Sequence, residues 1–305
     1  MPRPTYLKLY ESGELDRRIE ILNKKLESCT ICPRRCRVNR LEDNIGFCRS
    51  GKNPIVSSYN AHFGEEPPIS GIYGSGTIFF TNCTLRCIYC QNYPISQLSN
   101  GKEHSVEELA SMMLSLQRRK CHNINFVTPT HFVPQIVSAL KIAIKNGFNI
   151  PLVYNTSGYE SIETLKLLEG IIDIYLPDMK YSDNEMSLKY SGVSDYWEIN
   201  KLAIKEMFRQ VGDLKMDRDG IAYRGLIIRH LVLPYNIAGS KKILEFLKNE
   251  VSTTVTIGIM SQYFPAYKAV NDEKLKFKIT KEEYDEVVNY AINLGFKNIL
   301  IQGYY

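Results

Sequence analysis

The chain has 305 residues, 44% of them hydrophobic and 23% charged, a composition that supports one substantial core and excludes a disordered chain. Its net charge of +5 argues against binding of nucleic acid through bulk electrostatics, and no run of about 18 apolar residues predicts a membrane span. The N-terminus, Met-Pro-Arg-Pro-Thr, lacks the apolar core of an export signal, and eight cysteines are too few for a disulfide scaffold, so we expect a cytoplasmic protein in a reducing environment.

Residues 1–70 are predicted to form an N-terminal cysteine-rich segment. Cys29, Cys32, Cys36 and Cys48 follow a C-x2-C-x3-C-x11-C spacing, and four thiolates are what a closed zinc site or a fully ligated 4Fe-4S cluster requires. A segment this small, with Pro and Arg throughout, is a poor candidate for a hydrophobic core of its own, so a metal centre would stabilise it. The spacing leaves zinc and a second 4Fe-4S cluster as alternatives.

Four arginines are interleaved with these cysteines. Guanidinium groups offset the net negative charge of thiolates around a metal, which gives the arginines a local explanation. A solvated basic face, or a surface that recruits an acidic or phosphorylated partner, are the other interpretations. The residues concerned are Arg34, Arg35, Arg37 and Arg40.

The stretch from His62 to Gly71 contains two adjacent acids, Glu65 and Glu66, next to two prolines. Together with His62 the acids could form a metal or acid/base set. The proline and glycine content favours instead a structured loop over the mouth of the following domain.

Residues 71–305 alternate short apolar runs with helical patterns, which is typical of parallel strands joined by crossover helices. Ser105 with Glu108 forms a capping box, and Gly147 marks a helix end. An open doubly wound sheet usually carries a phosphate loop after its first strand, whereas here that loop carries cysteines, so we expect an α/β barrel or partial barrel. The predicted strands are 77–81, 125–128, 151–154, 171–176, 226–233, 254–259 and 298–301, and the predicted helices are 105–119, 133–146, 161–168, 197–211, 240–250 and 281–294.

Cys83, Cys87 and Cys90 follow the first of these strands with C-x3-C-x2-C spacing. Structural metal sites are normally closed by four protein ligands, whereas three thiolates on a 4Fe-4S cluster leave one iron open for a small molecule. The nearest further cysteine, Cys121, is distant in the sequence, so zinc has no obvious fourth ligand. We therefore favour a catalytic cluster over a disulfide or a zinc site.

In barrels of parallel strands the working residues lie at the carboxyl ends of the strands. At the second strand the hydroxyls or carbonyls of Thr128 and Thr130 could accept a hydrogen bond from an ammonium group. His131 beside them is either a core histidine or a proton donor. At the third strand, Asn155 and Ser157 suit a carboxylate or a ribose, although an ordinary turn would use the same residues.

The next two strand ends carry charges. Asp178 and Lys180 are spaced to form a buried ion pair, and such a pair is rarely kept for stability alone. Arg229 occupies the corresponding place one strand later, either as a cofactor contact or as part of a charged pair at the barrel rim. We predict that these residues bind the cofactor.

The three-cysteine motif, with aromatic Tyr89 before its last cysteine, resembles that of the radical S-adenosylmethionine (SAM) enzymes. Within them, the stretches 29–40, 74–80, 87–92 and 229–234 look like the group named as homologues of pyruvate formate-lyase activating enzyme. Two features differ from relatives: the residues 126–132 replace the usual Gly-Gly-Glu stretch, and the extra cysteines precede the radical motif rather than follow it, which sets the chain apart from glycyl-radical activases.

The resemblance implies a partial (β/α)6-type TIM-like barrel over 71–305, with a 4Fe-4S cluster on Cys83, Cys87 and Cys90 and with Tyr89 among the SAM contacts. It implies reductive cleavage of SAM to a 5'-deoxyadenosyl radical, which abstracts hydrogen from an unknown substrate. A protein or peptide is the candidate substrate, and the charge of the chain argues against a nucleic acid. Ferredoxin or flavodoxin is the expected electron donor, and an oxygen-sensitive cluster suits anaerobic conditions.

Two alternatives stay open at the level of sequence. The chain could be a non-catalytic zinc or iron-sulfur binding module in which the barrel serves as a platform. It could also be an RNA-modifying radical SAM enzyme, for which the arginines of 34–40 are the only hint.

Overall fold

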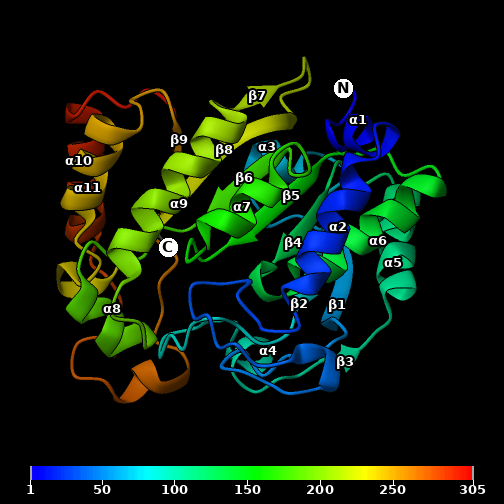
Figure 1. The fold of residues 1–305 in the computed structure, drawn as a ribbon. Helices are drawn as coiled ribbons and strands as arrows, with labels where there is room; N and C mark the ends of the chain where they lie inside the picture. The colour runs from blue at the N-terminus through cyan, green and yellow to red at the C-terminus, as the bar shows by residue number, and fades with distance from the viewer. Residues whose placement is uncertain (1, 304–305) are drawn as a thin grey trace.

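The computed structural model describes residues 2–303 and has a mixed α/β fold. A ten-stranded, mostly parallel sheet curves through the molecule, and its strands are ordered β10-β9-β8-β6-β5-β4-β2-β1-β3, with β7 paired to β8 (Figure 1). Within the described residues the two ends of this order, β10 and β3, do not pair with each other, so the sheet is not closed. The predicted partial barrel is confirmed.

All seven predicted strands are present, and they pair with one another in parallel. The fourth begins later than predicted, because Ile171 and Ile172 donate their backbone N–H groups to Leu168 at the end of the preceding helix. The fifth begins earlier, because its start pairs with the short β7. The strands are β2 (Ser75–Phe80), β4 (Ile124–Val127), β5 (Leu152–Thr156), β6 (Ile174–Pro177), β8 (Ala222–Leu231), β9 (Thr256–Met260) and β10 (Ile299–Ile301).

Three further strands were not predicted. β1 (Ile55–His62) pairs antiparallel with β2, β3 (Lys102–Glu103) pairs with β1, and β7 (Lys215–Met216) pairs with β8. The middle of β1 is exposed and polar, so it lacks the apolar run that marks the other strands. Because β1 lies within residues 1–70, backbone hydrogen bonds join the predicted N-terminal segment to the sheet.

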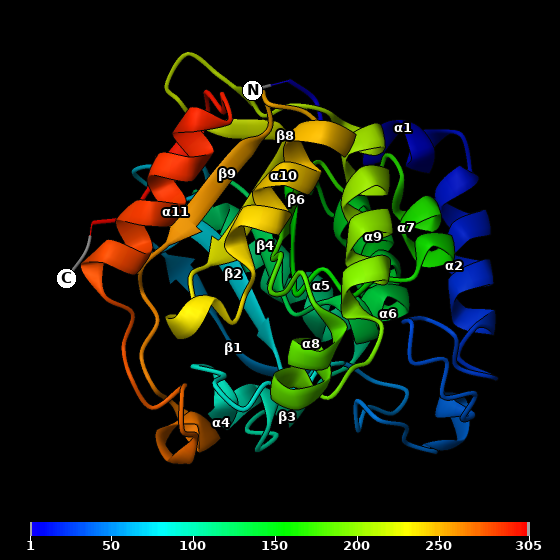
Figure 2. The same cartoon turned by 90° about the vertical axis from the view of Figure 1, so that its left-hand side faces the viewer.

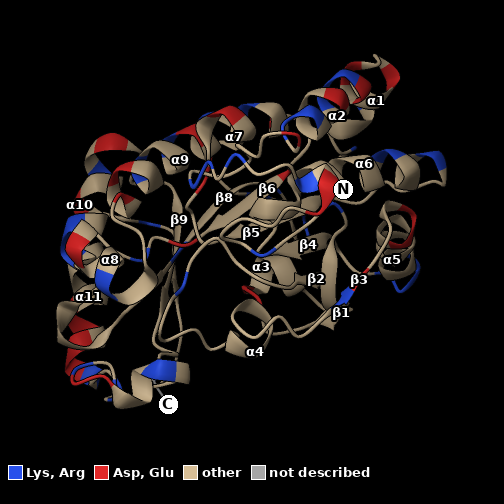
Figure 3. Cartoon of the chain, turned by 60° about the horizontal axis from the view of Figure 1, so that its bottom comes forward, with Lys and Arg blue, Asp and Glu red and all other residues tan. Residues whose placement is uncertain are grey.

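Helices cover the outer face of the curved sheet (Figure 3). The six predicted helices are confirmed, and the capping box of Ser105 and Glu108 is formed. They are α5 (Val106–Arg118), α6 (Val133–Lys145), α7 (Ile162–Leu168), α9 (Tyr196–Val211), α10 (Ser240–Glu250) and α11 (Lys281–Asn293). The structure adds α1 (Tyr6–Glu11), α2 (Glu14–Lys24), α3 (Pro67–Ser70), α4 (Tyr93–Ser96) and α8 (Asn184–Ser191).

The concave face of the sheet encloses α3, as Figure 3 shows. There Ile69 of α3 packs in a small apolar cluster with side chains of β5, β6 and β8. Val153 and Ile227 of this cluster lie two positions before Asn155 and Arg229, so alternation along the strands places those polar residues on the same inner face, nearer the carboxyl ends. α4 and α8 lie at that end of the barrel (Figure 2). Of the helices in residues 2–303, none is long and apolar enough to span a bilayer.

Candidate active site at the carboxyl ends of the strands

A cavity of about 140 Å³ lies between the cysteine loop and the ends of four parallel strands. The three cysteines of the motif form part of its wall. Six of the eight residues predicted to bind the cofactor line the same cavity, although they come from four different strand ends. They are Thr128, Asn155, Ser157, Asp178, Lys180 and Arg229.

Each motif cysteine has a hydrogen-bonding partner at its sulfur. Cys83 Sγ accepts from the Leu85 backbone N–H (3.4 Å), Cys87 Sγ accepts from Ser191 Oγ (2.9 Å), and Cys90 Sγ lies 3.0 Å from Ser96 Oγ. Burial raises the pKa of the Cys83 thiol to about 12, and the neighbouring cysteine sulfur adds to this effect. Thiolates here therefore need a compensating positive charge, which a bound metal centre provides.

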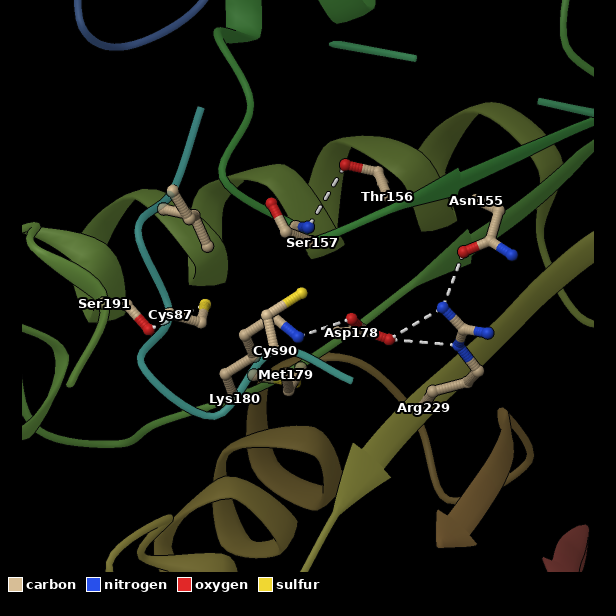
Figure 4. A network of polar contacts seen from close by, with 12 residues as sticks. Cys87, Cys90, Asn155, Thr156, Ser157, Asp178, Met179, Lys180, Ser191 and Arg229 are labelled. Carbon is tan, nitrogen blue, oxygen red and sulfur yellow. Dashed lines mark hydrogen bonds and ion pairs between the residues drawn. The ribbon is translucent and has the colours of Figure 1, made fainter. Parts of the chain in front are cut away.

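Asp178 lies between two cations on the opposite wall (Figure 4). Its Oδ2 accepts from Lys180 Nζ (2.7 Å) and its Oδ1 from Arg229 Nε (3.0 Å), while the Arg229 guanidinium also donates to Asn155 Oδ1 (2.6 Å). Burial alone would raise the pKa of Asp178, but the charges of Arg229 and Lys180 outweigh it and lower that pKa. The carboxylate is therefore ionised and holds both cations in fixed positions before any ligand binds.

The loop after β5 is held close against the loop after β6. Tyr196 Oη donates to the Ser157 carbonyl (2.7 Å), and Asn200 Nδ2 donates to the carbonyls of Gly158 and Asp178 (3.1 Å each). Gly158 has φ +73°, and a β-carbon there would lie 2.2 Å from Asn200 Nδ2 and 2.4 Å from the Asp178 carbonyl oxygen. Only glycine fits, so this residue fixes how Ser157 faces the cavity.

The structure does not bring Tyr89 and Thr130 to the cavity lining. The buried Tyr89 ring makes edge contacts with Tyr181 and Tyr263. Thr130 turns away in a short 3-10 helix and donates to Glu160 (2.5 Å). A direct contact of either residue with SAM stays a prediction, and their observed contacts are those of supporting residues.

Sequence reasoning missed residues at the cavity and behind it. Ser96 ends α4, Gln97 follows it, and both line the cavity beside Cys90. Ser191, which contacts Cys87, ends α8, and α8 has too weak an apolar stripe to be recognised from periodicity. Ser96 carried one usable signal, since it lies six positions after Cys90 in the same short loop.

The four N-terminal cysteines line a second, much smaller cavity together with His131 and Arg40. Gly46 makes room there, because a β-carbon on it would lie 3.0 Å from Cys36 Sγ. Across residues 2–303, no three His, Cys, Asp or Glu side chains converge closely enough to share a single metal ion.

His131 links this small cavity to the loop that carries Cys83, Cys87 and Cys90. Its Nε2 lies 2.9 Å from the Thr81 carbonyl oxygen, two positions before Cys83, and its Nδ1 is buried without a hydrogen-bonding partner in the described part of the chain. Because a carbonyl only accepts, Nε2 carries the proton and Nδ1 is a free acceptor. Burial lowers the pKa of His131 to about 3, so the ring is neutral.

Two arginines hold the two cysteine groups together. Arg34 donates to the carbonyls of Thr84 and Gly192, and Arg86 donates to the Phe47 carbonyl. The Phe47 ring lies between both guanidiniums, 3.6 Å from Arg34 and 4.5 Å from Arg86.

The remaining arginines of the 34–40 stretch differ in exposure. The Arg40 side chain is fully buried and donates to the Gly51 and His131 carbonyls. Arg35 is exposed but pairs with Glu163. Arg37 is exposed as well. Two of the four arginines therefore have internal contacts, and one of the two exposed ones is paired with an acid.

Comparison with known proteins adds an independent finding. Residues 77–213 match the family model of the radical SAM superfamily. The chain is 33% identical over 290 residues to the uncharacterized protein MJ0674 of Methanocaldococcus jannaschii, covering 91% of this chain and 78% of that protein. It is 28% identical over 305 residues to the uncharacterized protein MJ0808 of the same organism, covering 92% and 83% respectively.

Among solved structures, a radical SAM methyltransferase from Sphaerobacter thermophilus superposes with a TM-score of 0.51 at 12% identity. The match covers 74% of this chain and 66%, just under two thirds, of the methyltransferase. At this identity the likeness is one of fold.

Proposed function

Because the chain belongs to the radical SAM superfamily, we propose that it is an enzyme that holds a 4Fe-4S cluster on Cys83, Cys87 and Cys90 and binds SAM in the adjoining cavity. One observation carries this proposal: the three thiols and a preorganised polar network line the same cavity. When bound, these groups supply one electron and a 5'-deoxyadenosyl radical that removes a hydrogen atom from the substrate, leaving methionine, 5'-deoxyadenosine and a substrate radical.

The side chains of the cavity suit the polar groups of SAM. We assign Lys180 and Arg229 to the methionine carboxylate, because both are cations held in place by Asp178. Asn155 and Ser157 suit the ribose hydroxyls or the same carboxylate, and Thr128 can accept from the ammonium group. The Thr128 backbone has φ +58°, a conformation that non-glycine residues rarely adopt and that clusters at functional sites.

The proposal extends to a second 4Fe-4S cluster on Cys29, Cys32, Cys36 and Cys48. Each cysteine of a cluster binds a different iron, whereas zinc needs all four sulfurs about 2.3 Å from one point. The four thiols line one cavity and can therefore serve as the ligands of one closed centre, and we choose a cluster over zinc because the proposed neighbouring cluster already requires iron-sulfur assembly.

The electron donor in this proposal rests on the superfamily, and the subgroup and substrate rest on the sequence. Enzymes of this kind need an electron donor, for which ferredoxin or flavodoxin is our proposal. The resemblance to the homologues of pyruvate formate-lyase activating enzyme, and a protein or peptide as substrate, remain predictions from sequence.

An anaerobic assay tests the proposal. We expect the chain, reconstituted with iron and sulfide, to form 5'-deoxyadenosine when given dithionite and SAM. Cys87→Ala should abolish the product, whereas Cys121→Ala, at a buried cysteine outside both groups, should not. Full cluster loading without product in the wild type would overturn the catalytic assignment.

The second centre has its own readout. About eight irons per chain indicate two clusters, whereas about four irons with one zinc indicate the alternative. In Cys32→Ala the catalytic cluster should remain, because its three ligands are separate residues. Loss of all iron from this variant would contradict two independent centres.

A further inference from the structure

A larger cavity, of about 470 Å³, adjoins the cavity proposed for SAM and shares Arg229 with it. It is separate from the small cavity lined by the N-terminal cysteines. Its walls come from the loop between β1 and α3, from β9 and from β10. Its volume falls within the range of about 300–1,000 Å³ that is usual for small-molecule sites. The cavity is therefore large enough for a substrate group that is brought next to the cofactor.

The charges of this cavity do not balance. Its charged lining residues are Glu65, Glu66 and Arg229. The Arg229 guanidinium lies 3.6 Å from Glu65 and is already engaged by Asp178. Glu66 is attracted by the same Arg229, but its Oε2 is buried without a hydrogen bond in the described residues. The carboxylates of Asp178, Glu65 and Glu66 therefore share one guanidinium, and one oxygen of Glu66 has no donor.

The remaining lining is mostly apolar. Met260 and the strand β10 form walls, and Phe63 is exposed at the edge of the cavity. Gly258 faces Glu66, and a β-carbon there would lie 3.7 Å from Glu66 Oε1, so the absence of a side chain keeps the space before the carboxylate open. Gln262 and Gln302 complete the lining. A partly apolar cavity that contains a carboxylate oxygen without a donor suits an aliphatic chain with a cationic end.

We propose that this cavity is the substrate pocket and that Glu66 binds an alkylammonium or guanidinium group of the substrate. The inference rests on the proposed function for the identity of the neighbouring cavity. Burial raises the pKa of Glu66, and Arg229 offsets only part of that effect, so a cationic ligand would supply the missing charge. The source of the cation is a free amine or a Lys or Arg side chain of a peptide, and the two are separated by experiment.

Calorimetric titration of the reconstituted wild-type protein is the first test. The probes are n-butylamine, n-butanol and butyrate, which share an aliphatic chain and differ in charge, and an acetylated, amidated Gly-Lys-Gly tripeptide. We expect n-butylamine or the tripeptide to bind at least about tenfold more tightly than n-butanol, and butyrate not to bind, because hydrogen bonds between opposite charges are stronger than those between neutral groups. Preference for the amine indicates a small-molecule source, and preference for the tripeptide a peptide source.

Variants locate the binding site. Glu66→Gln keeps the shape of the side chain and removes its charge, so affinity for the cationic probe should fall at least about tenfold. Glu185→Gln, at an exposed position on α8, is the matched control and should bind as the wild type does. The thermal midpoint of each variant shows whether it is folded, and the comparison of probes on the wild type does not depend on any variant.

The outcomes separate this inference from the proposed function. Equal binding of n-butylamine and n-butanol, no binding of either cationic probe at millimolar concentration, or unchanged affinity in folded Glu66→Gln would each overturn the inference. These readouts are independent of turnover. Formation of 5'-deoxyadenosine without selective cation binding would leave the proposed function intact and remove only the substrate class.

Discussion

At the scale of single residues, the interior of this barrel contains an acid that is satisfied only by hydroxyl groups. Glu160 is buried, and its carboxyl group accepts from Thr130, Thr156 and Tyr154, with no basic side chain among its hydrogen-bonding partners. Burial raises the pKa of Glu160 to about 7, and the three hydroxyls offset only part of this effect. The folded state therefore holds the Glu160 proton more tightly than the unfolded chain does.

This linkage gives a pH-dependent stability. The contribution of Glu160 is fully present below pH about 4.5 and is lost as pH rises through about 7, an effect on the order of 3 kcal/mol. In Glu160→Gln, the urea midpoint should fall less between pH 5 and pH 8 than it does in the wild type. Glu185→Gln should follow the wild type, and identical pH profiles for Glu160→Gln and wild type would show that Glu160 does not bind the proton.

The sequence did not show which of Thr128 and Thr130 lines the cavity. Both were predicted to contact the cofactor, yet only Thr128 lines the cavity, because its φ of +58° turns the chain and the following 3-10 helix directs Thr130 to Glu160. The burial and hydrogen bonding of Glu160 could not be predicted from the sequence, because its partners come together only when the strand ends meet. Asp178, Lys180 and Arg229 were predictable because charges at successive strand ends must converge.

At the scale of elements, the short runs of apolar and β-branched residues predicted all seven parallel strands, since strands buried on both faces have this pattern. β1 and α8 were missed for the converse reason. β1 is polar and half exposed and gains its order from pairing with β2, and α8 has little amphipathic character and is held by its caps. Elements defined by tertiary pairing leave little trace in local sequence.

The loop after β5 yields a prediction at this scale. Gly158→Ala should weaken SAM binding and lower stability well beyond the roughly 1 kcal/mol of backbone strain, because its β-carbon would collide with Asn200 and the Asp178 carbonyl. Gly147→Ala is the matched control: φ there is +85°, but no atom lies within 4 Å of the added carbon, so only the strain applies. Equal losses in the two variants, measured by urea unfolding and SAM titration, would show that the close approach is unimportant.

At the scale of the whole molecule, the N-terminal segment is integrated with the barrel. β1 extends the sheet, and Arg34 and Arg86 reach across between the two cysteine groups around the ring of Phe47. The cysteine spacing predicted two metal groups, but their contacts could not be predicted, because the joining carbonyls belong to loops with no pattern of their own. The boundary at residue 70 remains a prediction.

Phe47 tests this integration. Phe47→Leu keeps the backbone contacts and most of the apolar volume but removes the ring between two guanidiniums, so unfolding free energy should fall by about 1–2 kcal/mol. Phe47→Tyr, which retains an aromatic face, should lose less. If urea unfolding gives the same value for both variants, the aromatic contact does not contribute to holding the segments together.

Arg229 belongs to the walls of both barrel cavities and contacts an acid in each direction. A ligand that pairs with Arg229 in one cavity changes the electrostatic potential in the other. The ligands of the two cavities are therefore thermodynamically coupled through one guanidinium. On the assignments proposed above, this coupling is reciprocal: the ligand of the larger cavity would alter the affinity for SAM by the same factor by which SAM alters the affinity for that ligand. A single side chain would then couple cofactor binding to the presence of substrate.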